Sequence, residues 1–178
     1  MNPNTTRLLA ILFAIGAAAA LRLVPHPPNF APVGALALFS GAYLGPRALA
    51  FAAPIGAMLV SDAIIGFHSA MPFVYAGVAA TVLLGQLALS RPSLLRVAGA
   101  AIASSVLFFA LTNFGVWLQS GMYPPTLAGL AACYVAAIPF FQNSLAGDLF
   151  FSALLFGGFA LAERAVPTLR AAAEPSPA

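Results

Sequence analysis

Residues 22–32, RLVPHPPNFAP, interrupt a chain that is otherwise almost continuously apolar. This stretch places an arginine, a histidine, four prolines and an asparagine between two long apolar segments. Charges and unpaired backbone polar groups are costly in lipid, so the chain is expected to leave the hydrocarbon here. The stretch therefore separates a first membrane-spanning segment from a second.

The composition of the whole chain supports this division. Of the 178 residues, 62% are hydrophobic and 6% are charged, and the mean hydropathy is +0.99. A soluble domain carries roughly 25% charged residues, so we predict an all-α integral membrane protein. The single cysteine, Cys133, excludes an intramolecular disulfide and a cysteine-based zinc site. The formal charge of +3 is too sparse to indicate nucleic-acid binding.

Six apolar segments are candidates for crossing a membrane, which takes about 20 residues. In chain order they are 7–24, on the N-terminal side of the opening stretch, and 32–44, 48–65, 73–89, 94–111 and 145–162 after it. The second is short, and the further apolar run 126–138 has the length of a re-entrant or interfacial segment. Two arrangements compete, with seven spans or with six and a dipping helix. We predict a six-transmembrane-helix bundle with a short extra helix in the last external loop.

The arginines favour the six-span arrangement. With the N-terminus inside, six of the seven basic residues fall on the cytoplasmic side: Arg7, Arg47, Arg91, Arg96, Arg164 and Arg170. Only Arg22 falls outside, whereas seven spans would spoil this positive-inside bias. We expect one transmembrane domain over 1–165 and a disordered cytoplasmic tail over 166–178. Both termini are then cytoplasmic.

Polar and aromatic side chains gather on the external side in this topology. Interfacial belts explain part of the cluster but not its one-sidedness. From it we predict a ligand-binding site formed by Arg22, Asn29, Asp62, His68, Asn113, Trp117, Gln119, Tyr123, Asn143 and Asp148. His26 and Gln142 lie on the same side. The prolines of the opening stretch are expected to stiffen the loop over this site.

Two carboxylates stand out because they lie within predicted spans. Intramembrane Asp62 and Asp148 mark either a functional site or an ion pair, and Arg22 is the cation at their depth. Structural pairing and ligand binding remain equal alternatives at this point. The three formal charges sum to −1, which favours a polar, neutral or weakly cationic heterocycle as ligand.

Other patterns are weaker or missing. Ala10, Ala14 and Ala18 recur at four-residue spacing, which suits either packing inside the bundle or docking to another membrane protein. We find no Walker motif, no GxSxG elbow and no HExxH pair. We therefore expect no cofactor, no metal and no enzymatic activity.

Several stretches resemble a family of small bacterial integral membrane proteins. They are RLVPHPPNFAPVGALALFSGAYLG, SDAIIGFH, VY, TNFGVWLQSGMYPPTLAGL and CYVAAIPFFQNSLAGDLFFSALLFG. That family resembles the substrate-binding S components of energy-coupling-factor (ECF) vitamin transporters in size, six spans and an external cavity. The resemblance implies micronutrient uptake across the bacterial cytoplasmic membrane, with a separate coupling protein and ATPases as partners. It also implies that Ala10, Ala14 and Ala18 contact the coupling protein.

Two other functions compete with a substrate-binding subunit. An intramembrane enzyme acting on a lipid or isoprenoid would use Asp62, Asp148 and His68. A non-catalytic membrane scaffold would use the polar loops to bind protein. We rank both below the binding subunit, because no nucleophile or metal signature accompanies the carboxylates.

Overall fold

The computed structural model describes residues 3–45 and 48–170, and every regular element in these ranges is helical. The long helices are α1 (Pro3–Ala20), α2 (Val33–Leu44), α3 (Ala48–Ile65), α4 (Met71–Ala88), α5 (Leu94–Gln119) and α6 (Leu127–Ala165). Two 3-10 helices, η1 (Leu21–Leu23) and η2 (Pro167–Leu169), follow α1 and α6. The predicted all-helical fold is confirmed over the described residues.

Five of these helices are long and apolar enough to cross a membrane: α1 with η1, α3, α4, α5 and α6. The exception, α2, has 12 residues and spans only about 18 Å at 1.5 Å per residue. It packs against each of the other five long helices, and most of its residues are buried. A helix that is apolar all round belongs in the interior of a bundle. The shortest α-helix, α2, therefore lies at the centre of this bundle.

Glycines allow α2 to approach α4 closely. A Cβ at Gly41 would overlap the backbone of Val82, and one at Gly85 would overlap the backbone of Leu38. In lipid, the hydrophobic effect does not drive helices together, so their association relies on close backbone packing, which small residues allow. This explains why an apolar helix too short for the bilayer is firmly held.

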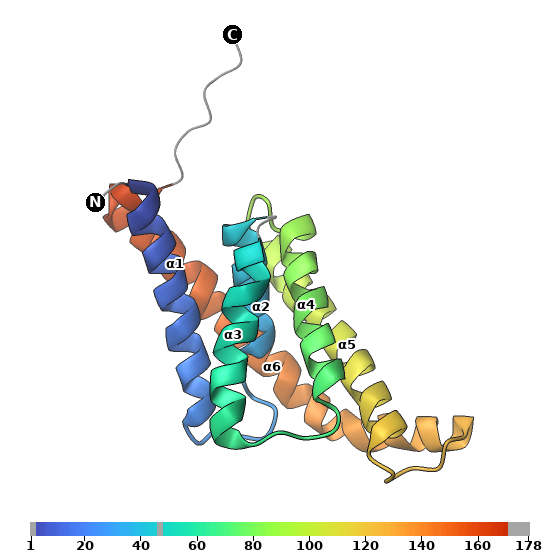
Figure 1. Ribbon diagram of the computed structural model, residues 1–178. Coiled ribbons are helices and arrows are strands. Elements are labelled where there is room, and N and C mark those ends of the chain that lie inside the picture. The colour runs from blue at the N-terminus through green and yellow to red at the C-terminus, as the bar shows by residue number, and fades with distance from the viewer. Residues whose placement is uncertain (1–2, 46–47, 171–178) are drawn as a thin grey trace.

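The two ends of the bundle in Figure 1 are formed by segments with different charged residues. The arginine end carries both termini of the described chain and Arg7, Arg91, Arg96, Arg164 and Arg170. The loop end carries the segments 24–32, 66–70 and 120–126, with Arg22 beside them. Arg47 lies outside the described residues.

The structure corrects two of the predicted boundaries around α5 and α6. The apolar run 126–138 forms no separate short helix, because α6 continues through Pro139 as one helix of 39 residues. Helix α5 extends to Gln119, eight residues beyond the predicted 111, so the connecting loop is short. Proline is tolerated within membrane helices because neighbouring groups can satisfy the freed backbone carbonyl. Figure 1 shows the first part of α6 lying across the loop end before the helix rises towards the arginine end.

The predicted disordered tail also begins too early. Pro167–Leu169 form η2, and Leu169 is buried where η2 packs on α1. An ion pair between Arg7 and Glu163 joins α1 to α6 beside this contact. Residues 171–178 of the predicted tail lie outside the described residues.

Candidate functional site

The opening stretch folds into a tight turn. The Phe30 N–H donates to the Pro27 carbonyl over 3.0 Å, and Asn29 has a φ of 63°. Proline at the second position and a positive φ at the third are features of a type II turn, where asparagine is tolerated. The sequence PPNF thus encodes the turn directly.

Helix α6 holds this turn in place. The Asn143 amide donates to the Pro28 carbonyl over 2.9 Å. The Phe30 ring packs on Phe150 and Phe151, with centroids 5.9 and 5.5 Å away. The segment 24–32 is therefore a fixed cover over the loop end.

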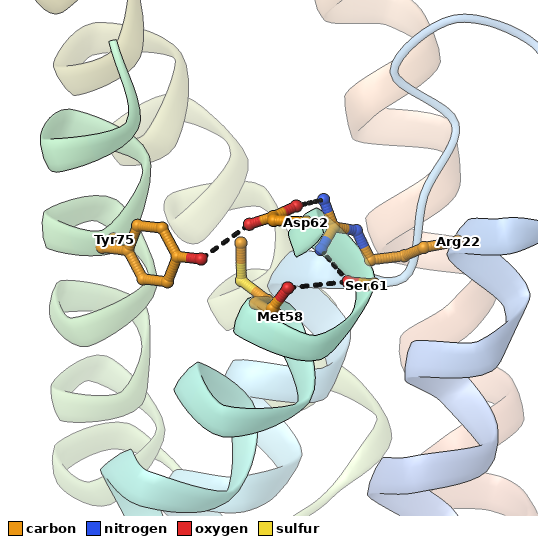
Figure 2. A network of polar contacts seen from close by, with 5 residues as sticks. All are labelled: Arg22, Met58, Ser61, Asp62 and Tyr75. Atoms are coloured by element: carbon orange, nitrogen blue, oxygen red, sulfur yellow. Dashed lines mark hydrogen bonds and ion pairs between the residues drawn. The ribbon is translucent and has the colours of Figure 1, made fainter. Parts of the chain in front are cut away.

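A polar network lies beneath this cover (Figure 2). Arg22 of η1 pairs with Asp62 of α3 over 2.7 Å and donates a second bond to Ser61. The other Asp62 oxygen accepts a 2.7 Å bond from the Tyr75 hydroxyl of α4, and Ser61 donates to the Met58 carbonyl. Both carboxylate oxygens of Asp62, which is only 4% exposed, are thus satisfied. The network links η1 to the consecutive helices α3 and α4.

The second carboxylate has a different set of partners. Asp148 of α6 accepts from the backbone N–H groups of Gly34 and Ala35 and lies 2.6 Å from the Ser105 hydroxyl. These N–H groups belong to the first turn of α2, whose preceding residue, Pro32, makes no side-chain cap. The first N–H groups of a helix have no partner within the helix, so a carboxylate there satisfies them and favours the helix dipole. Asp148 caps the central helix from outside it.

Gly34 makes this capping possible. A Cβ at that position would overlap the Asp148 carboxylate. The carboxylate therefore sits against the backbone of α2 at a depth where unpaired N–H groups would be costly.

A cavity of about 400 Å³ opens at the loop end, beyond the start of α2. Because α2 is shorter than its neighbours, it leaves this space between them unfilled. The polar side chains that line the cavity are Arg22, His26, Asn29, His68, Ser144 and Asp148. The apolar ones include Met58, Ile65, Val74 and Phe108. Both histidines of the chain thus face one cavity.

A side cavity of about 300 Å³ adjoins the first. It shares Asn29, His68, Val74, Phe108 and Ser144 with the larger cavity and extends between α5 and α6 towards Asn113. Pockets of 300–1,000 Å³ with apolar walls and a few converging polar groups are typical of small-molecule sites. We name the two together the loop-end cavity.

The structure brings together only part of the predicted site. Arg22, Asn29, His68, Asn113 and Asp148 line the loop-end cavity. Asp62 lies behind Arg22, as its ion-pair partner.

Four other predicted site residues do not line the cavity. Trp117 donates to the Pro124 carbonyl over 3.0 Å, in the turn between α5 and α6. Gln119 is the exposed last residue of α5, and Tyr123 lies in the turn that follows. Asn143 supports the cover.

The alanine stripe of α1 faces its own bundle. Ala18 belongs to the buried core, and Ala10 and Ala14 are partly buried against it. This is the packing alternative left open by the spacing, and the role of the stripe in docking stays a prediction. Within the described residues, no three histidine, cysteine or acidic side chains lie close enough together to hold a metal.

Sequence reasoning missed the hydroxyl groups of the site. Tyr75 and Ser105 donate to the two carboxylates, Ser61 accepts from Arg22, and Ser144 lines the cavity. The sequence did contain a signal for them, because buried carboxylates need hydrogen-bond donors and hydroxyl side chains within the spans are the candidates. Spacing alone does not say which hydroxyl faces which carboxylate.

Comparison with known proteins gives one family match. The sequence model of a family of unknown function (DUF6580) matches residues 2–169. No curated protein and no solved structure matches the chain.

Proposed function

The chain belongs to this family (DUF6580), and we propose that it is a membrane-embedded subunit that binds a small polar molecule for uptake. The observation that carries the proposal is the loop-end cavity, where several polar side chains converge between apolar walls at the end of the bundle opposite the arginine end. Arginine-rich ends are cytoplasmic under the positive-inside rule, so this cavity faces out of the cell. The protein is then a multi-pass component of a bacterial cytoplasmic membrane with both termini inside.

The state of the two carboxylates favours binding over catalysis. Asp62 is engaged by Arg22 and Tyr75, and Asp148 by Ser105 and the first turn of α2. A general acid or base needs a proton-transfer position that a reacting group can reach. Here both carboxylates already stabilise the protein around the cavity. This supports a binding subunit rather than an enzyme acting on a lipid or isoprenoid.

The same contacts define the ligand class. Arg22 and Asp62 neutralise one another, whereas Asp148 has no cationic partner among the described residues. The His26 Nδ1 donates to the Pro27 carbonyl, so the other ring nitrogen of His26 and both ring nitrogens of His68 are left for hydrogen bonds to a ligand. The cavity therefore suits a polar, neutral or weakly cationic heterocycle of micronutrient size. Energy for uptake would come from a separate coupling protein and ATPases, as in ECF transporters, because the sequence has no Walker motif.

The experiment is a thermal-shift screen of the purified protein against a library of micronutrients and related heterocycles. A ligand is expected to raise the melting temperature, and native mass spectrometry should show one bound molecule. Asn113→Ala removes a side chain that lines the cavity, whereas Gln119→Ala changes an exposed amide on the same helix. We expect at least about tenfold weaker binding in the first variant, or about 1.4 kcal/mol, and no change in the second. Equal binding by both variants would place the ligand elsewhere.

A further inference from the structure

A second hollow lies at the opposite end of the bundle. It has a volume of about 510 Å³ and lies between the start of α5 and the last turns of α6, with α2 behind it. We name it the arginine-end groove. It shares no lining residue with the loop-end cavity, so the proposed function makes no use of it.

The groove exists because α5 and α6 diverge. Their side-chain contacts run from Ser105–Asp148 towards the loop end, through Phe109–Phe141 to Asn113–Cys133. Towards the arginine end the two helices separate (Figure 1). Val97 of α5 and Ala153 of α6 then face the space between them. This part of the bundle is open where a membrane helix pair would normally be packed.

The walls of the groove are apolar along its depth and polar at its mouth. Leu94, Val97, Ala153, Phe156, Gly157 and Ala160 form an apolar slot. Ser90 and Ser93 lie in the turn at its mouth, and the paired Arg7 and Glu163 also line the groove. The slot lies within segments that are apolar enough to span a membrane. A slot of this kind fits an acyl chain that enters from the side, with its headgroup at the level of the turn.

The segments that border the groove carry more arginines than acidic residues, although Arg7 and Glu163 within the groove neutralise one another. Of the acidic residues that the structure describes, only Glu163 lies at this end, and it is paired with Arg7. The described residues supply no carboxylate partner for the exposed Arg91, Arg96, Arg164 and Arg170. Arg91 lies within the turn 90–94 that forms the mouth, and Arg164 follows Glu163 on the other side. Basic side chains beside cytoplasmic clefts between membrane helices attract anionic headgroups, at about 1 kcal/mol per arginine.

We propose that the arginine-end groove is a binding site for an anionic phospholipid. The acyl chain lies along Ala153, Gly157 and Ala160, and the headgroup phosphate lies at the mouth near Arg91 and Arg96. This site is independent of ligand binding at the loop end. The bound lipid would fill the space between α5 and α6 and fix how far apart their ends lie.

Two adjacent glycines provide a matched test of the slot. Neither Gly157 nor Gly158 has an atom within 4 Å of an added Cβ, so both positions have room for a larger side chain. Only Gly157 lines the groove. Gly157→Leu should block the acyl chain, and Gly158→Leu should leave it undisturbed. Ala153→Leu fills the same slot from the preceding turn and serves if Gly157→Leu does not fold.

The assay is native mass spectrometry of the full chain released from bilayers of phosphatidylglycerol and phosphatidylcholine with identical acyl chains. We expect about tenfold preferential retention of phosphatidylglycerol, and its loss in Gly157→Leu but not in Gly158→Leu. The double variant Arg91→Gln/Arg96→Gln should lower the preference about tenfold while leaving the melting temperature of the delipidated protein unchanged.

Three results would overturn the proposal. Equal retention of phosphatidylglycerol and phosphatidylcholine would show that the headgroup charge does not contribute to binding. Equal retention by Gly157→Leu and Gly158→Leu would show that the lipid lies elsewhere. Co-purification of a stoichiometric membrane protein, displaced by Gly157→Leu in the absence of lipid, would assign the groove to a partner helix instead.

Discussion

Removing Arg22 should destabilise the protein through the carboxylate that it leaves behind. In Arg22→Ala, buried Asp62 keeps the Tyr75 hydroxyl but loses its cation, and Ser61 loses a donor. Breaking a buried pair from one side typically costs about 3–5 kcal/mol. The Arg22 side chain is 15% exposed at the cavity, so water can reach part of the site. We therefore expect a value near the lower limit, about 3 kcal/mol.

The double-mutant cycle separates loss of the pair from loss of arginine packing. In Asp62→Asn the amide can still accept one bond but carries no charge, so Arg22→Ala should cost much less in that background. The expected coupling between the two positions is about 2 kcal/mol, within the range for residues in direct contact. Arg91→Ala is the control, because Arg91 is exposed and forms no ion pair with the described residues, and it should change stability by less than about 0.5 kcal/mol.

The assay is equilibrium unfolding in mixed micelles, followed by the fluorescence of the single tryptophan. Trp117 lies in the last turns of α5 and makes none of the hydrogen bonds of the mutated network. Equal stability of Arg22→Ala and Arg91→Ala would refute the buried pair. A coupling near zero would show that Asp62 does not depend on Arg22.

Three further predictions follow from other parts of the structure. Asp148→Ala should destabilise the protein by about 1–3 kcal/mol, measured by the same unfolding assay, because it leaves the N–H groups of Gly34 and Ala35 unpaired. Gly85→Ala should lower the melting temperature more than Gly158→Ala, since only the first Cβ meets the backbone of a neighbouring helix; equal losses would contradict the close α2–α4 contact. Reporter fusions at Ser69 should read external and fusions at Arg170 cytoplasmic, and the reverse result would invert the topology.

Much of the fold was predictable from apolar segments and arginine positions. Charges are so costly in lipid that the opening stretch and the arginine turns had to lie at helix ends, and they do. The continuity of α6 was not predictable, because Pro139 and the polar residues Gln142 and Asn143 are typical of the end of a helix. In a bundle, their polar groups can be satisfied by other segments, as Asn143 is by the Pro28 carbonyl.

The central position of α2 was also not predictable from the sequence. A 12-residue apolar run can be a buried helix or an incomplete span, and only the packing through Gly41 and Gly85 decides between them.

The candidate site was predictable in its charges but not in its geometry. Intramembrane aspartates are rare enough to identify Asp62 and Asp148, and Arg22 was the obvious partner. That Arg22 pairs with Asp62, while Asp148 caps α2, depends on the three-dimensional arrangement. Trp117 was predicted to belong to the site, but on α5 its neighbour Val116 lines the cavity, whereas the Trp117 ring donates to the Pro124 carbonyl instead.

The most direct test of the proposed function is a structure of the protein with the ligand identified by the thermal-shift screen. We expect ligand density in the loop-end cavity, between the cover at 24–32 and the first turn of α2, in contact with Asn29 or His68. Ligand density at the arginine end, or a bound ligand that leaves the loop-end cavity empty, would contradict this expectation.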